Sequence, residues 1–185
     1  MRDSIQEQKV GDYLIKILQD IEPENPREWD NLGRMVCFHK KYSLGDQHNY
    51  NSNNFCSWDE LLSQISKDHQ LAVIIPIYMY DHSGITISTT PFSCPWDSGQ
   101  IGFIFVSKEY ALKEYGGSKI TKKLKEKLTQ HLIGEVETYD QYLTGDVYGF
   151  QITLNDEELD SCWGYFGTES CLNEAKSIVE SYSHN

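Results

Sequence analysis

The chain has 185 residues, 39% hydrophobic and 12% aromatic, and this composition excludes a disordered protein because it supplies enough apolar surface for a core. No apolar run approaches the roughly 20 residues of a membrane-spanning helix, and the N-terminus lacks the apolar segment of a secretory signal, so we expect a cytoplasmic protein. The 16 basic and 28 acidic residues give a net charge of −12, opposite to the usual signature of a nucleic-acid-binding domain.

The first part of the chain predicts two strands and a helix. β-branched and aromatic residues at 12–20, before the turn sequence EPENP, predict a strand. A second strand is predicted at 34–42. Ser57 then precedes an amphipathic segment at 58–68 with acidic residues in its first turn, which is the pattern of a capped helix.

The middle of the chain predicts three strands and a short helix. The strands cover 71–80, 84–90 and 101–107, and the turn sequences DHSG and FSCPWDSGQ separate them. A short helix is predicted directly afterwards, at 108–115.

The last part predicts a long helix, a hairpin and a final helix. Apolar residues recur every three or four positions between 121 and about 143, so one face of that helix is apolar. The segments 146–154 and 158–166 predict a hairpin about an NDEE turn. Thr168 is the expected cap of a helix over 169–181.

This order of elements predicts an α+β fold, because strands that are neighbours in sequence are close enough to pair antiparallel. We expect a mostly antiparallel sheet with helices packed on one side, in a single domain over 1–185. The glycine-rich phosphate-binding motifs are absent from the sequence, and we expect no cofactor.

Polar residues in the predicted loops give a catalytic alternative. Cys94 is a candidate nucleophile, with His82 or His39 as its base and Asp97 or Asp81 orienting the imidazole, because such chemistry needs a thiolate held by an imidazole. However, SCPW is not a recognised local signature of a cysteine hydrolase. A small hydrolase centred on His39, His82 and Cys94 stays an alternative to a non-enzymatic protein.

A metal site is a related alternative, formed by His39, Asp46, His48 and His82. Imidazoles and carboxylates suit zinc, manganese or iron, and Asp46 and His48 occupy alternate positions of an extended chain, where they point the same way. Against this, the sequence has no HExxH-like pair, and its five cysteines form no CxxC pair. The leading expectation is that the protein binds no metal.

The acidic residues of the final third are the candidate partner-binding surface. From Leu132 to the end, eleven acidic residues accompany a single basic one, Lys176, and this segment carries −10 of the net charge. Such a surface either keeps the protein in solution or complements a basic groove on another macromolecule, where carboxylates imitate phosphates. The carboxylates expected to form it are Glu135, Glu137, Asp140, Asp146, Asp156, Glu157, Glu158 and Asp160.

The lysine-rich stretch between Lys108 and Lys127 is a weaker candidate for a contact with DNA. Lysines neutralise phosphates, but Glu109, Glu114 and Glu126 interrupt this stretch, as on an ordinary solvated helix face. Direct contact with DNA is therefore the lesser alternative.

Four stretches together resemble a family of small acidic proteins carried by phages and conjugative elements of Firmicutes. They are WDNLGRMVCFHKKYSLGD, YDHSGITISTTPFSCPWDSGQIGFIFVSKE, GEVETYDQYLTGDVYGF and LDSCWGYFG, and the resemblance covers about 29–167. The chain is also similar to a type of anti-CRISPR protein that inhibits the type II effector nuclease. This resemblance implies a non-enzymatic anti-defence protein that acts inside the bacterial host and binds an effector nuclease or its nucleoprotein complex. It carries over no site residue and leaves the oligomeric state open.

Overall fold

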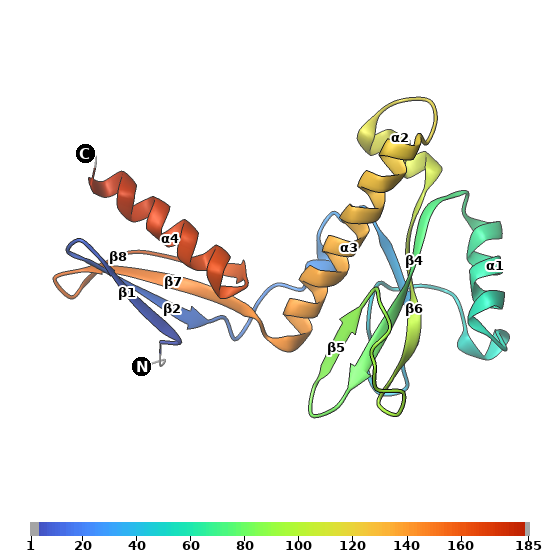
Figure 1. The fold of residues 1–185 in the computed structure, drawn as a ribbon, viewed down its shortest axis with the longest axis horizontal. Helices are drawn as coiled ribbons and strands as arrows, with labels where there is room; N and C mark the ends of the chain where they lie inside the picture. The colour runs from blue at the N-terminus through green and yellow to red at the C-terminus, as the bar shows by residue number, and fades with distance from the viewer. Residues whose placement is uncertain (1–3, 184–185) are drawn as a thin grey trace. The chain divides into compact units, whose positions relative to one another are not determined.

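The computed structural model describes residues 4–183, which form four α-helices and eight β-strands in two antiparallel sheets (Figure 1). The predicted α+β class is confirmed. Contacts group the chain into two compact units: unit 1 consists of Met1–Pro26 and Gln141–Asn185, and unit 2 of Arg27–Asp140. Each unit has its own sheet, whereas the sequence predicted a single sheet for the whole chain. The single domain over 1–185 stays a prediction.

Unit 1 contains a four-stranded sheet in which every neighbouring pair is antiparallel. In spatial order its strands are β1 (Gln6–Val10), β2 (Tyr13–Gln19), β7 (Val147–Leu154) and β8 (Glu157–Phe166). Strand β1 was not predicted, because its sequence QEQKV has almost no apolar residue. It lies at an edge of the sheet, where few of its side chains need to be buried.

Helix α4 (Thr168–Ser183) covers one face of this sheet. Its buried side chains recur every fourth residue, so they share one helix face. They pack against β2 and β7, and the cluster consists of Ile15, Ile17, Phe150, Ile152, Cys171, Ala175 and Val179. Full burial of an isoleucine or phenylalanine side chain contributes about 1.5–3 kcal/mol, so this cluster dominates the stability of unit 1.

The hairpin between β7 and β8 turns in two residues. Asn155 and Asp156 have φ values of 51° and 67°, as a two-residue type I′ turn requires, and these residue types adopt that conformation more readily than most. The predicted four-residue NDEE turn is therefore too long. Glu157 and Glu158 belong to strand β8.

Unit 2 contains the second four-stranded sheet. In spatial order its strands are β3 (Arg34–Cys37), β6 (Ser98–Ser107), β4 (Leu71–Asp81) and β5 (Ile85–Ser88). Strand β3 ends at Cys37, earlier than the predicted 34–42, and the chain leaves the sheet there. Strand β6 begins at Ser98, so the predicted FSCPWDSGQ loop is shorter than expected.

The helices of unit 2 are α1 (Trp58–Asp68), α2 (Lys108–Tyr115) and α3 (Lys122–Thr144), the last belonging to unit 2 as far as Asp140. The predicted cap of α1 is confirmed, since the Ser57 side chain accepts a hydrogen bond from the Glu60 amide. Two short 3₁₀ helices, Pro26–Glu28 and Ser52–Asn54, lie in the connections. None of the helices among the described residues has the length and hydropathy to cross a membrane.

Helices α1 and α3 lie on opposite faces of the unit 2 sheet (Figure 1). Leu61 and Ile65 of α1 pack with Phe103 and Phe105 of β6. Ile104, which points to the other face because strand side chains alternate, meets Leu132 of α3 near Gly33: a Cβ atom at Gly33 would lie 2.8 Å from Ile104 Cδ1 and 2.5 Å from Leu132 Cδ2. The predicted packing of helices on one side of the sheet is found in unit 1, but in unit 2 helices lie on both faces of the sheet.

Candidate functional site

The eight acidic residues predicted to form one surface are divided between the two units. Glu135, Glu137 and Asp140 belong to unit 2, whereas Asp146 and the four acids of the β7–β8 hairpin belong to unit 1. Each group is therefore considered within its own unit.

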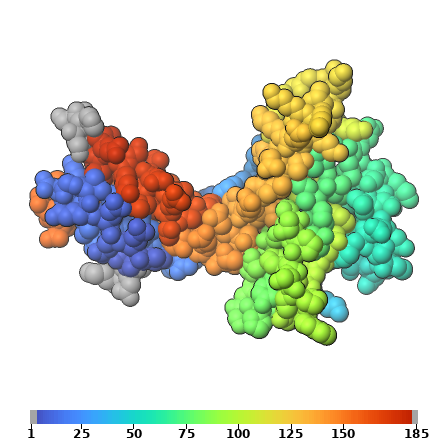
Figure 2. Space-filling view, in the orientation of Figure 1, coloured from blue at the N-terminus to red at the C-terminus, as the bar shows by residue number. Residues whose placement is uncertain are grey.

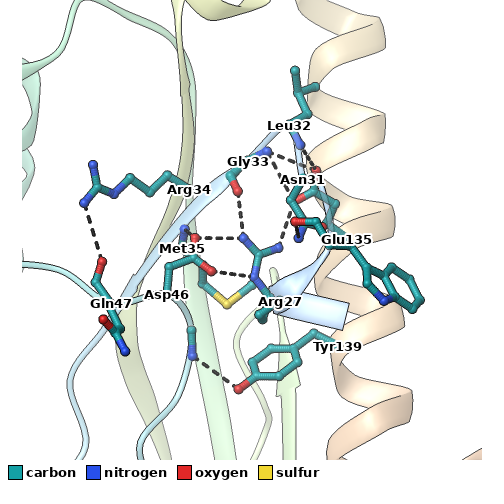
Figure 3. Close-up of polar contacts among 12 residues, drawn as sticks. Arg27, Asn31, Leu32, Gly33, Arg34, Met35, Asp46, Gln47, Glu135 and Tyr139 are labelled. Atoms are coloured by element: carbon teal, nitrogen blue, oxygen red, sulfur yellow. Dashed lines mark hydrogen bonds and ion pairs between the residues drawn. The ribbon is translucent and has the colours of Figure 1, made fainter. Parts of the chain in front are cut away.

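Glu135 is a buried structural residue (Figure 3). Its side chain is 8% exposed, and Arg27 Nη1 donates to Glu135 Oε2 at 2.9 Å. The amides of Leu32 and Gly33 donate to Oε1 at 2.8 and 3.0 Å. The carboxylate thus holds the segment before β3 against α3, and it is not available to imitate a phosphate.

Arg27 completes this buried network by binding a second carboxylate (Figure 3). Its side chain is 3% exposed, and Nε and Nη2 donate to the two Asp46 oxygens at 2.8 and 2.9 Å. Burial alone would lower the pKa of Arg27, but the hydrogen bonds and negative charges of Asp46 and Glu135 raise it. Nothing in the sequence pattern marked Arg27, because its partners are distant along the chain.

Asp140 and Asp146 also accept hydrogen bonds within their own units. Asp140 Oδ1 accepts hydrogen bonds from Thr86 Oγ1 and from the Ile87 amide, both at 2.7 Å, so it fixes strand β5 to α3. Asp146 Oδ2 accepts from Gln141 Nε2 at 2.9 Å. Glu137 is exposed on α3. Glu135 and Asp140 are held in the contacts described above, so they do not form an acidic surface with Glu137.

Three of the remaining acids, Asp156, Glu157 and Glu158, lie in the β7–β8 hairpin of unit 1. Together with Leu159 and Trp163 of β8 they form what we call the hairpin patch. The three acidic residues are exposed, and the side chains of Leu159 and Trp163 are 47% and 37% exposed. In the space-filling view, orange atoms of the β7–β8 segment reach the surface beside the blue N-terminal strands (Figure 2). The patch therefore combines negative charge with two large apolar groups.

Asp160 lies at the border of the hairpin patch and is half-buried. Its Oδ2 accepts a hydrogen bond from Tyr182 Oη at 3.0 Å. This hydrogen bond, together with burial and the charge of Asp160, raises the pKa of Tyr182. Asp160 thus joins β8 to α4 and is less exposed than the other three acids of the hairpin.

Strand β8 forms one edge of the unit 1 sheet, and its backbone is irregular. The β7–β8 register shifts between Tyr148 and Phe150 and again between Ile152 and Thr153, and the second shift leaves Leu159 as the extra residue. The Trp163 ring lies over Gly149, where a side chain would collide with it. Bulges hinder the addition of another strand, so this edge presents side chains rather than a regular row of free backbone groups.

The net charge is concentrated in unit 1. That unit has 14 acidic and four basic residues, which give −10, whereas unit 2 has 14 acidic and 12 basic residues, which give −2. Because β1, the turn after it and the connection after β2 add Glu7, Asp12, Asp20, Glu22 and Glu24 to the acids of the hairpin, the charged region is larger than the C-terminal third singled out in the sequence. A basic partner would therefore be attracted to unit 1.

The catalytic candidates Cys94, His82 and Asp97 are brought together at one end of the unit 2 sheet. His82 Nδ1 lies 3.4 Å from Asp97 Oδ2, and Cys94 Sγ lies 3.9 Å from the same oxygen. The aspartate therefore stands between thiol and imidazole, whereas a thiol nucleophile needs the imidazole next to it. The His82 and Asp97 side chains are 63% and 42% exposed, so the cluster is open to solvent.

The metal-site candidates are not brought together. Asp46 binds Arg27, and His48 Nε2 lies 3.0 Å from the Cys37 carbonyl oxygen. His39 stacks on Tyr42 with 5.0 Å between ring centroids. Over residues 4–183, no group of three or more His, Cys, Asp or Glu side chains has the arrangement of a metal site.

A groove of about 1370 Å³ lies in unit 2, and no sequence motif marks it. The end of β3, the loop that follows it and the start of α1 form its walls. Its lining includes cationic, aromatic and imidazole side chains.

Comparison with protein-family models finds no match, and comparisons with curated proteins and with solved structures find no significant match. The resemblance to mobile-element proteins and to an anti-CRISPR type therefore stays a prediction.

Proposed function

We propose that this protein is a non-enzymatic anti-defence protein of a phage or mobile element. In this proposal it acts in the cytoplasm of a bacterial host and inhibits a nucleic-acid-processing effector, such as a CRISPR effector nuclease, by binding a basic surface on it. The hairpin patch is the contact surface. The observation that carries the proposal is the concentration of −10 of the net charge in the unit that exposes this patch.

Charge and apolar contact have separate tasks in such a complex. A strongly negative unit accelerates association with the positive channel of a nucleic-acid-processing enzyme, and salt weakens this effect. Exposed Trp163 and Leu159 supply desolvated contact area, and tryptophan is among the residues that most often dominate binding energy. The patch therefore supplies apolar contact area as well as negative charge.

The test is binding to a purified type II effector nuclease in complex with its guide RNA. The double variant Glu157→Lys with Glu158→Lys reverses two exposed charges in the patch. The control, Glu22→Lys with Glu24→Lys, makes the same change at exposed residues of unit 1 that follow β2. These control positions lie at the other end of β2 from the hairpin turn, since Tyr13 pairs with Leu154 and Gln19 with Tyr148.

We expect the patch variant to weaken binding at least about tenfold, or roughly 1.4 kcal/mol, and to reduce its salt dependence. The control should weaken binding no more than about threefold. Equal losses in both variants would show that total charge, not the patch, determines binding. Undiminished inhibition of nuclease activity by the patch variant would disprove the proposed surface.

A small cysteine-dependent hydrolase is the second candidate, and the proximity of Cys94, His82 and Asp97 is the observation in its favour. The two candidates differ in their response to Cys94→Ala. The hydrolase requires the thiol, whereas the binding protein should keep full inhibition of the nuclease in this variant. Loss of that inhibition, with an unchanged circular dichroism spectrum, would favour the hydrolase.

A further inference from the structure

The groove of unit 2 has the dimensions of a site for an extended ligand. Its volume of about 1370 Å³ exceeds the roughly 300–1,000 Å³ of typical small-molecule pockets. It runs between the loop after β3 and the start of α1, and its lining residues fall between Arg34 and Leu61. The ligand is therefore expected to be longer than a single small molecule.

The charge in the groove is opposite to that of the protein as a whole. Arg34, Lys40 and Lys41 line it; Lys40 is exposed, and Lys41 Nζ lies 3.5 Å from Asp81 Oδ2 in an ion pair whose lysine side chain is exposed. Its one acidic lining residue, Asp46, pairs with Arg27 at 2.8 Å, so three cationic side chains and one carboxylate line the groove. The groove is thus locally positive and attracts an anionic ligand.

An exposed aromatic ring accompanies these cations. Tyr42 is 37% exposed and stacks on His39, with 5.0 Å between ring centroids and 10° between ring planes. Phe55 and Trp58, near the start of α1, also line the groove. A ring fixed in this way offers a stacking surface to a planar ligand.

His48 supplies a hydrogen-bonding group that no described residue satisfies. Its Nε2 lies 3.0 Å from the Cys37 carbonyl oxygen and must donate, because a carbonyl only accepts. In the neutral ring Nδ1 is then an acceptor, and this buried atom has no hydrogen-bond partner within residues 4–183. Because this atom is buried, a ligand in the groove does not reach it, and the cations and aromatic rings are the groups that the groove offers.

We propose that the groove binds single-stranded nucleic acid. Phosphates lie against Lys40, Lys41 and Arg34, and an unpaired base stacks on Tyr42. A positive groove with exposed aromatic rings is the usual combination for single strands, whereas the paired bases of a duplex do not expose their faces.

This site is in unit 2 and is independent of the hairpin patch. The test uses the full chain and a 5′-fluorescein-labelled 12-mer of deoxyadenylate, with fluorescence anisotropy at 50 mM salt. The variant Lys40→Glu with Lys41→Glu reverses the groove charge. The matched control is Lys122→Glu with Lys123→Glu, at exposed residues of α3 that do not line the groove.

We expect the groove variant to weaken binding at least about tenfold and to reduce the slope of log affinity against log salt by about 1.4, as two lost phosphate contacts predict. The control should stay within about threefold of the original affinity. Tyr42→Ala should weaken binding roughly fivefold or more. Circular dichroism checks that each variant is folded.

Several outcomes would overturn the proposal. These are an absence of saturable binding, an equal loss in the groove and control variants, or equal affinity for the corresponding duplex. Binding of ATP as tight as that of the 12-mer would show a mononucleotide site instead. Glu157→Gln with Glu158→Gln should leave oligonucleotide binding unchanged, so a failure of the groove proposal and a failure of the hairpin-patch proposal are distinguishable.

Discussion

Arg27 and Glu135 form a buried ion pair in which Nη1 lies 2.9 Å from Oε2, although the two residues are 108 positions apart in the chain. The pair joins the first residue of unit 2 to its last helix, and Asp46 binds the same guanidinium from the loop after β3. Three separate segments of unit 2 thus depend on one charged cluster. Its removal is a direct test of how unit 2 is held together.

Glu135→Ala should destabilise unit 2 by about 3–5 kcal/mol, because it leaves the buried guanidinium with one carboxylate fewer and two amides without their acceptor. The control is Glu137→Ala on the exposed face of the same helix, for which we expect a change below about 0.5 kcal/mol. Urea unfolding followed by circular dichroism measures both. Equal stability of the two variants would contradict the structural role of Glu135.

The thiol of Cys37 should make unit 2 less stable in alkaline solution. Burial, aided by the charge of Asp46 and opposed by Arg27, raises the pKa of Cys37 from 9.0 to about 12. The unfolded thiol ionises near pH 9, so the stabilisation is complete below that pH and is lost as pH rises towards about 12. Between these values the loss is about 1.4 kcal/mol per pH unit.

Urea unfolding at pH 8 and pH 10, under reducing conditions, measures this dependence. Cys37→Ala should remove part of the loss between the two pH values, whatever its effect at pH 8. Cys56→Ala, at an exposed cysteine, should not. An unchanged pH dependence in Cys37→Ala would show that other groups cause the alkaline loss.

The two-residue turn of the hairpin should respond differently to changes at its two positions. Asp156→Gly creates Asn-Gly, the preferred sequence for a type I′ turn, and should leave stability unchanged or raise it by up to about 1 kcal/mol. Asn155→Val places a β-branched residue at φ 51° and should lower stability by about 1–2 kcal/mol. Thermal unfolding compares the two, and a more stable Asn155→Val variant would contradict the turn assignment.

Gly149→Ala should disturb the packing of Trp163 in the hairpin patch. The added methyl group would collide with the indole ring and would lie 2.8 Å from the Cys162 carbonyl oxygen, so we expect a loss of about 1–3 kcal/mol. Gly134→Ala, on α3, is the control, since its Cβ would meet no atom within 4 Å. This control should be neutral or stabilising by up to about 1 kcal/mol.

The tryptophan environment gives Gly149→Ala a second readout. Displacement of Trp163 should shift the tryptophan fluorescence, whereas Gly134→Ala should not. If the spectrum of Gly149→Ala is unchanged, the indole does not lie over Gly149. The same variant should also weaken binding to the effector, because Trp163 is an apolar contact of the proposed surface.

Most elements of the fold could be predicted from the sequence because they carry local signals. Ser57 and the apolar spacing after it predicted α1, and the apolar run from Leu71 predicted β4. The strand Gln6–Val10 was missed because an edge strand with polar residues lacks apolar alternation. The division into two sheets was missed because strand pairing depends on partners distant in sequence.

The candidate site was harder to predict for the same reason. Glu135 and Asp140 were expected to be surface acids. Their partners Arg27 and Thr86 are 108 and 54 positions away, so no local pattern indicates these contacts. Asp156, Glu157 and Glu158 are adjacent in the sequence and all three are exposed, and their role in binding a partner stays a prediction. The groove was missed because Lys40, Tyr42 and His48 form no motif, and only the fold places them along one cavity.

The order β1-β2-β7-β8 in the unit 1 sheet has a consequence for how the chain is organised. If 27–140 is disregarded, the four strands follow one another in space as they do in sequence, as an up-and-down meander closed by α4. Unit 2 therefore has the topology of an insertion between two adjacent strands of a smaller ββββα module. Both ends of the chain must be synthesised before unit 1 can complete its sheet, whereas unit 2 is available to fold as soon as its own continuous segment has emerged.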